Sequence, residues 1–219
     1  MKKLLFAIIA SLSLTTLPIS AKDINESDSK LIELQFQDFV YTTPEINENN
    51  SIVIYEKNDN VESYKVYSKE SGLLTDEIQV SLDSNNDGIS LASDGVRDSI
   101  FTRYKNVYGG EKLVVRLRCD ISVSLYSSGS FRSFNGINYG KVSIDSRATP
   151  MYISGSDAAY VHSHTNSFPT TQLDYSYTVT VVTSGTIQVS AGTMISAGFS
   201  QNTYYYKTIN ETGTIKLYN

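Results

Sequence analysis

The sequence predicts an all-β protein: an antiparallel β-sandwich of the Ig-like or jelly-roll type, with a smaller, acidic, β-rich unit at its N-terminal end. Apolar and polar residues alternate over long stretches, as they do in strands with one buried face. Short β-like runs recur at spacings of roughly 8–12 residues, and turn residues separate them. No capped segment of helical periodicity follows residue 21, although residues 93–100 could hold a short helix.

Composition narrows the functional classes. The 219 residues include one Cys and no Trp, and 23 acidic residues against 18 basic ones give a net charge of −5. A single Cys excludes a disulfide framework and an all-cysteine zinc site. The acidic balance argues against a general nucleic-acid binder, because such a protein needs a basic surface.

Residues 1–21 have the features of an export signal. Lys2 and Lys3 precede a mostly apolar run, and Ile19-Ser20-Ala21 is a small-residue cleavage sequence. The run is shorter than the ~20 residues that a membrane-spanning helix needs. We therefore expect cleavage after Ala21 and a secreted, extracellular protein with no transmembrane segment. The lack of cystines and the frequent Lys, Asn and Ile favour a bacterial source.

Charge divides the remaining chain into an acidic N-terminal region, 22–97, and an expected sandwich domain, 98–219. Residues 22–98 hold 17 acidic and 6 basic residues, whereas residues 99–219 hold 6 acidic and 10 basic residues. This asymmetry is typical either of an acidic solvent-facing surface on one continuous fold or of an acidic segment that docks on and masks the more basic region.

Strands are expected in both regions. The β-like runs lie at 34–42, 51–57, 63–68, 77–82, 100–107, 113–125, 141–144, 151–154, 160–164, 173–181, 186–190, 203–209 and 214–218. The turn signals between them include Gly109-Gly110, Asn135-Gly136, Ser184-Gly185 and Thr212-Gly213.

The run at 113–125 is the strongest evidence for a strand in this sequence. Seven apolar residues, from Leu113 to Leu125, fall at every second position, which predicts a long strand with one buried face. The single cysteine, Cys119, belongs to this apolar set. We therefore expect Cys119 to be a buried core residue and not a nucleophile.

A candidate calcium loop lies at 83–94. Asp83, Asn85 and Asp87 occupy positions 1, 3 and 5, a Gly follows at position 6, and Asp94 stands at position 12. Over these 12 residues the chain resembles the calcium loop of EF-hand and dockerin-type proteins. It departs from the EF-hand pattern at position 12, which is Asp in place of Glu, and in the strand-like segment that precedes the loop. The alternative is an ion-free Asn-Asn-Asp-Gly turn.

The two histidines of the chain, His162 and His164, are separated by one residue. On a strand they would share a face and present two nitrogen ligands to a metal, with Asp157 or Asp174 as the nearest carboxylates in sequence. The alternative is a polar strand end without a metal.

Two aromatic segments are candidates for ligand contact. Residues 127–140 place aromatic rings and an arginine among Ser, Gly and Asn, a composition typical of binding loops, although Asn135-Gly136 also predicts a plain hairpin. The second segment is the tyrosine run at 204–206, of which the central residue should face the other way from its neighbours. The candidate ligand-binding residues are Phe131, Arg132, Phe134, Tyr139 and Tyr205.

Together these features predict a secreted, non-catalytic β-sandwich protein that recognises a protein or glycan at a cell surface, with no cofactor apart from the candidate calcium. The sequence lacks a GxSxG elbow, a P-loop, an HExxH motif and a Rossmann glycine pattern. Two alternatives stay open. One is a secreted hydrolase or metal-dependent enzyme that uses His162 and His164, and the other is a secreted effector or inhibitor with an acidic masking segment.

Overall fold

The computed structural model describes residues 30–58, 61–82, 95–148, 151–183 and 205–218. Within these residues every regular element is a strand, and neighbouring strands are antiparallel. The predicted all-β class is therefore confirmed, whereas the Ig-like or jelly-roll assignment stays a prediction. In this part of the chain no helix is long and apolar enough to cross a membrane.

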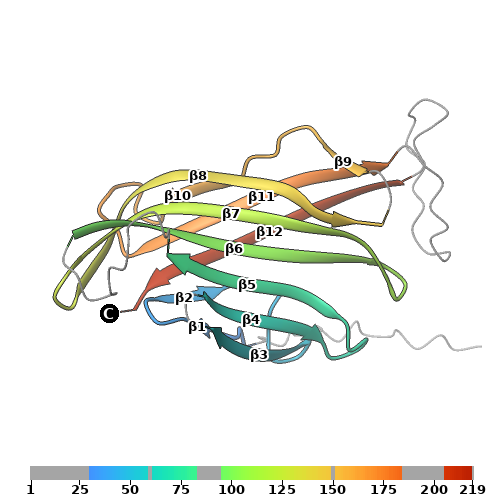
Figure 1. Ribbon diagram of the computed structural model, residues 1–219, viewed down its shortest axis with the longest axis horizontal. Coiled ribbons are helices and arrows are strands. Elements are labelled where there is room, and N and C mark those ends of the chain that lie inside the picture. The colour runs from blue at the N-terminus through green and yellow to red at the C-terminus, as the bar shows by residue number, and fades with distance from the viewer. Residues whose placement is uncertain (1–29, 59–60, 83–94, 149–150, 184–204, 219) are drawn as a thin grey trace, which may run out of the picture.

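The strands form two six-stranded sheets (Figure 1). The first, here called the β11 sheet, has the order β1 (Leu34–Gln35), β2 (Phe39–Thr42), β12 (Tyr205–Leu217), β11 (Gln172–Thr183) and β10 (Tyr160–Ser163), and β9 (Met151–Ser154) also pairs with β11. The second, the β7 sheet, has the order β3 (Ser51–Asn58), β4 (Val61–Ser68), β5 (Leu74–Leu82), β6 (Gly95–Gly109), β7 (Lys112–Ser128) and β8 (Phe131–Arg147).

Strand β7 carries the alternation that the sequence predicts. Every second side chain from Val115 to Leu125 is buried, whereas Leu113, near the start of the strand, is 38% exposed. Cys119 lies in this buried set at 1% exposure, and burial raises the pKa of its thiol to about 12. The long strand and the core position of Cys119 are confirmed. A thiol with this pKa is not a nucleophile near neutral pH.

Strands of the acidic region take part in both sheets. β2 pairs with β12, and β5 pairs with β6. Phe39, Tyr41 and Ile78 belong to the same buried cluster as the β7 residues, so one core joins side chains from both charge regions. The division of the chain at residue 98 stays a prediction. The short helix considered at 93–100 is wrong for residues 95–100, which begin β6 as its partner β7 continues alongside.

Two predicted turns are strand interior. Asn135-Gly136 lies within β8, where the register with β7 shifts nearby, and Thr212-Gly213 lies within β12. The turn signal fails at both places because a long neighbouring strand continues alongside: β11 pairs with both Thr212 and Gly213, and β7 pairs with Gly136 while Asn135 is skipped at a register shift. The turn at Gly109-Gly110 is confirmed: it joins β6 to β7, and Gly110 has a φ of 67°.

Four expectations lie outside the described residues. They are the export signal at 1–21, the candidate calcium loop with Asp83, Asn85, Asp87 and Asp94, the turn at Ser184-Gly185 and the strand at 186–190. They stay predictions.

Candidate functional site

A row of polar side chains crosses the outer face of the β11 sheet. In register, Thr42 of β2 pairs with Thr214 of β12, Thr214 pairs with Asp174 of β11, and Asp174 pairs with His162 of β10. These residues point outward because their neighbours in sequence, such as Tyr175, point into the core. Four strands, of which β2 is distant in sequence from the other three, therefore build one surface.

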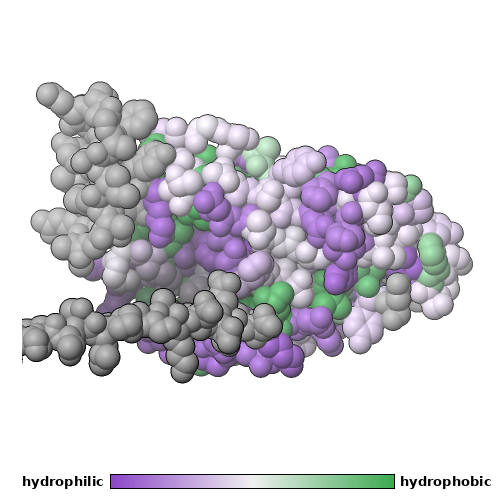
Figure 2. All heavy atoms as spheres, turned by 180° about the vertical axis from the view of Figure 1, so that it is seen from behind, coloured by the Kyte–Doolittle hydropathy of each residue, from purple (hydrophilic) through white to green (hydrophobic). Residues whose placement is uncertain are grey.

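This row lies in an open groove of about 380 Å³. More than half of its lining residues carry a hydroxyl group, and Figure 2 shows this side of the molecule as mostly pale and purple with separate green, hydrophobic patches. The lining residues are Leu31, Thr42, Thr43, Pro44, His162, Asp174, Tyr175, Ser176, Thr212, Gly213 and Thr214.

An exposed ring lies beside the groove. Tyr160 of β10 pairs in register with Ser176, a lining residue, and its side chain is 67% exposed. The centroid of its ring is 5.2 Å from that of His162. An exposed aromatic face beside fixed polar groups offers a ligand both stacking and hydrogen bonds.

Asp174 organises the polar groups of this face. Its carboxylate accepts hydrogen bonds from Thr214 Oγ1 at 2.8 Å and from Gln172 Nε2 at 3.1 Å, and it lies 2.7 Å from His164 Nδ1. Partial burial alone would raise the pKa of Asp174, but the hydrogen bonds from His164, Thr214 and Gln172 outweigh that effect and lower it. Asp174 is therefore an ionised acceptor at neutral pH.

The histidines have different surroundings. His162 Nδ1 lies 3.1 Å from the carbonyl oxygen of Ser163, whereas His164, just beyond the end of β10, contacts Asp174. Asp174 was one of the two carboxylates predicted from the sequence to lie nearest to the histidines, and in the structure its side chain contacts His164. Across the described residues no group of three or more His, Cys, Asp or Glu side chains could hold a metal. A metal role for His162 and His164 stays a prediction.

The candidate contact residues of 127–140 do not form one patch. Phe131 is 56% exposed at the start of β8, and Tyr139 is 47% exposed eight residues further along the same strand. Phe134 is fully buried and stacks on Phe39, with 6.1 Å between ring centroids, so the structure gives its ligand-binding role no support. Arg132 donates to the carbonyl oxygens of Gly129 and Phe131 near the β7–β8 turn.

Tyr205 begins β12 and pairs in register with Thr183. Its side chain lies outside what the structure describes, and its ligand-binding role stays a prediction.

Reasoning from the sequence missed an ion cluster that lies between the two sheets. Arg103 of β6 has no exposed surface, and its guanidinium donates to Asp76 Oδ1 at 2.8 and 2.9 Å. Across the core it donates to the hydroxyl of Tyr41 at 3.0 Å and pairs with Glu211 of β12 at 2.7 Å. The hydroxyls of Tyr41 and Tyr175 are 2.8 Å apart. Arg103 therefore connects the two sheets by polar contacts.

Burial affects each charge of this cluster differently. Burial opposes the charge of Arg103, but the neighbouring Tyr41 and Asp76 raise its pKa well above the usual range. Arg103 and Lys105 overcome the burial of Asp76 and lower its pKa. For Glu211 burial is the larger effect and raises its pKa, although the same two cations oppose the shift.

A signal for this cluster exists in the sequence. In the alternation of 100–107, Arg103 occupies an inward position between Phe101 and Val107, and Glu211 does so between Ile209 and Ile215. Opposite charges at inward positions of two strands indicate a buried ion pair, because an unpaired charge in a core is too costly.

Comparison of the chain with models of known protein families, with curated proteins and with solved structures gives no match. The functional argument therefore depends on the surface described above.

Proposed function

We propose that the protein is an exported, non-catalytic β-sandwich protein that recognises a protein or glycan at a cell surface, and that the groove on the outer face of the β11 sheet is its contact site. The observation that carries this proposal is the row Thr42, Thr214, Asp174 and His162 beside the exposed ring of Tyr160. Fixed polar groups next to an aromatic face suit a ligand rich in hydroxyl or amide groups.

The arrangement of the groove supports binding through its preorganisation. Asp174 is held by Thr214, Gln172 and His164, so that its oxygens have defined directions before a ligand arrives. A site that is ordered in advance loses less side-chain entropy on binding. A groove that is open to solvent and has several hydroxyl groups in its lining suits part of a larger polymer better than a small apolar molecule.

The test is binding of the purified protein to a panel of immobilised glycans and to cell-envelope preparations. We expect saturable binding that Tyr160→Ala weakens about tenfold or more, which corresponds to a loss of roughly 1.4 kcal/mol. Asp174→Asn should also weaken it, because the amide replaces an ionised acceptor.

Tyr139→Ala is the matched control, since Tyr139 is an exposed tyrosine on the other sheet. Unchanged binding by this variant supports the groove. Weakening by Tyr139→Ala alone would instead place the contact surface on β8, and no saturable binding by the unmodified protein would contradict recognition itself.

One observation favours a second candidate, a secreted hydrolase or metal-dependent enzyme that uses His162 and His164. It is the 2.7 Å contact between His164 Nδ1 and Asp174, because a carboxylate that orients an imidazole is common in acid–base and metal sites. Metal content and hydrolytic activity of the purified protein, compared with a variant carrying His162→Ala and His164→Ala, test it. Equal values in both proteins would remove this candidate.

A further inference from the structure

Two exposed tyrosines lie on the outer face of the β11 sheet. Tyr160 of β10 pairs in register with Ser176, and Tyr152 of β9 pairs with Val182. Directly paired residues of neighbouring strands point to the same face of a sheet, and Ser176 and Val182 are an even number of residues apart, so both rings belong to the outer face. Tyr160 is 67% exposed and Tyr152 is 56% exposed. Tyr152 therefore gives this face a second aromatic ring, beyond the groove.

The spacing of the two rings fits an extended ligand. Because β12 pairs with β11 along its whole length, β9 and β10 both lie on the other edge of β11, and Figure 1 shows them toward its opposite ends. Their partners Ser176 and Val182 are six residues apart, which is about 20 Å along an antiparallel strand. A small molecule stacked on Tyr160 cannot reach Tyr152, whereas a chain of linked units can contact both.

Hydroxyl and amide side chains occupy the outer positions of β11 and β12 between the two rings. The register pairs Ser176 with Thr212, Thr178 with Asn210 and Thr180 with Thr208. The hydroxyl oxygens of Thr180 and Thr208 are 3.2 Å apart, and the side chains of Thr178 and Asn210 are exposed. Each hydroxyl both donates and accepts hydrogen bonds, and branching at Cβ restricts the threonine rotamers. These groups are therefore arranged before a ligand arrives.

The charges of this face argue against an acidic ligand. Among the outer positions of β11 and β12 that the structure describes, the charged side chains are Asp174 and Lys216, and both lie near β2, at the end away from Tyr152. The carboxylate of Asp174 would repel an anionic chain in the groove, and the outer positions from Ser176 to Thr180 hold no cation that could attract one. An uncharged chain meets neither difficulty.

The same face lacks the apolar centre that a protein partner usually requires. Protein interfaces depend on central aromatic, aliphatic or arginine anchors that become fully buried. Here the two rings stand at the ends, and the paired side chains between them are Ser, Thr and Asn. A sugar ring, in contrast, stacks on a tyrosine through its C–H groups and uses its hydroxyls to bond to polar side chains.

We propose that the outer face of the β11 sheet binds an extended, uncharged polysaccharide that runs along β11, with one sugar ring on Tyr160 and another on Tyr152. This inference rests on the proposed function and narrows its ligand from a protein or glycan to a neutral glycan chain. Thr178 and Asn210 bond to the sugar units between the two rings. Two contacts on one chain reinforce each other, because binding at the first ring raises the effective concentration of the chain at the second.

Calorimetric titration of the purified protein tests the proposal, with hydroxyethyl cellulose, mannan and dextran as uncharged probes and alginate as an acidic probe. We expect at least one uncharged polymer to bind and alginate not to bind. Tyr152→Ala and Tyr160→Ala should each weaken binding of that polymer about tenfold. Tyr139→Ala, an exposed tyrosine on the other sheet, is the matched control and should leave the affinity unchanged. Circular dichroism establishes that each variant keeps its strands.

Chain length separates an extended site from a single sugar site. A disaccharide of the bound polymer is too short to reach both rings, and the groove holds it beside Tyr160. Its affinity should therefore fall in Tyr160→Ala and stay unchanged in Tyr152→Ala, whereas the affinity of the polymer should fall in both variants.

The outcomes distinguish this proposal from the broader one. Weaker polymer binding by Tyr160→Ala alone would confine the ligand to the groove, so that the proposed function would stand and the extended site would be wrong. Binding to alginate or to envelope proteins, with none to the uncharged polymers, would overturn the neutral glycan in the same way. No saturable binding to any of these preparations would contradict recognition itself.

Discussion

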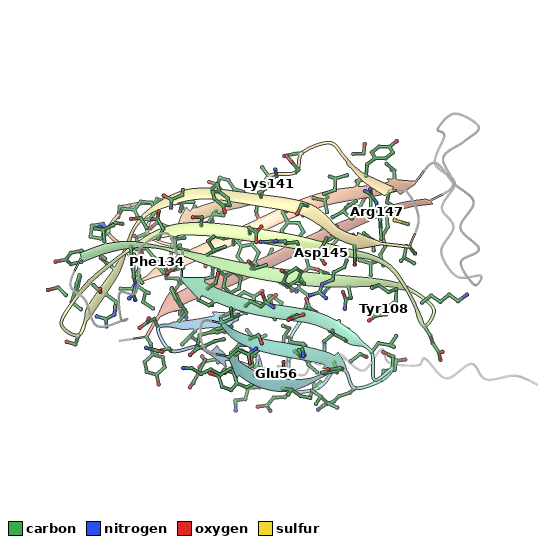
Figure 3. All side chains as sticks on the ribbon, viewed as in Figure 1. Glu56, Tyr108, Phe134, Lys141, Asp145 and Arg147 are labelled. Carbon is green, nitrogen blue, oxygen red and sulfur yellow. The ribbon has the colours of Figure 1, made fainter. Side chains whose placement is uncertain are left out.

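Two of the groups of ion pairs among the described residues use the same residue types at different depths. Between the sheets, Arg103, Asp76 and Glu211 are 0%, 2% and 4% exposed. On the outer face of the β7 sheet, Arg116 pairs with Glu77 at 2.7 Å and with Asp145 at 3.4 Å, and its guanidinium lies 4.1 Å from the ring centroid of Tyr104. Figure 3 labels Asp145 on β8 at this face.

The comparison shows that burial, more than the distance between the charged atoms, decides how strongly protein stability depends on an ion pair. The outer pairs keep part of their exposure, 23% for Arg116 and 34% for Asp145, so water screens them in part and each is worth less than a fully buried pair. The inner group has already lost its water, and every charge there depends on its partners. The predictions below test this difference, from the largest expected effect to the smallest.

Arg103→Met should have the largest effect. It leaves Asp76 and Glu211 buried without their main cation, and breaking a buried pair in this way costs about 3–5 kcal/mol. Urea unfolding measures the loss, and Arg103→Lys, which keeps the charge, should lose less. A loss below about 1 kcal/mol for Arg103→Met would show that the core accepts unpaired carboxylates.

Gly213→Ala should destabilise the protein by about 1–3 kcal/mol. A Cβ at Gly213 would lie 2.6 Å from Cε1 of the Tyr175 ring, so the ring must move and disturb its hydrogen bond to Tyr41. Gly136→Ala in β8 is the control, because a Cβ there meets nothing within 4 Å. Thermal unfolding compares the two variants, and equal melting temperatures would contradict the close approach.

The two acids of the buried cluster should respond oppositely to pH. The pKa of Asp76 is lowered from 3.8, so its contribution to stability is present above that pH and is lost as pH falls through the folded-state value. The pKa of Glu211 is raised from 4.5, so its contribution is present below that pH and is lost as pH rises through the folded-state value.

Asp76→Asn should therefore cost more stability at pH 7 than Glu211→Gln, and the gap should narrow toward pH 3. Urea unfolding of both variants between pH 3 and pH 7 provides the measurement. A gap that widens on acidification would reverse the assigned directions of the two pKa shifts.

Arg116→Ala on the outer face should have the smallest effect, about 0–1 kcal/mol, and added salt should reduce it further. The matched comparison is Arg103→Met, whose loss should change little with salt because its partners are buried. Urea unfolding at low and high salt measures both. An Arg116→Ala loss as large as that of Arg103→Met would remove the distinction between the two groups.

Local pattern predicted the strands and their buried faces well. The alternation from Val115 to Leu125 was sufficient to identify β7 and to bury Cys119, because the two-residue period has a single structural interpretation. It failed at Asn135-Gly136 and Thr212-Gly213, where a dipeptide preference was outweighed by long partner strands. Gly213 meets a packing need, since it leaves room for the ring of Tyr175.

The groove was beyond prediction for a different reason. Its central row combines Thr42, His162, Asp174 and Thr214, and their meeting depends on the order and register of four strands. The histidines and Asp174 could be predicted as neighbours from the sequence, because these residues are close along the chain. It contained no information that β2 and β12 lie beside them.

Tyr175 contributes both to the outer groove and to the buried ion cluster. It contributes to the lining of the groove, while its hydroxyl bonds to Tyr41 and lies within 3.4 Å of Arg103. The lining of the outer groove is thereby connected through Tyr175 to the buried ion cluster. A substitution that disrupts the interior ion cluster should therefore let the Tyr175 side chain move and change the shape of the groove. Mutations far from the surface can thus lower the affinity for a ligand that they do not contact.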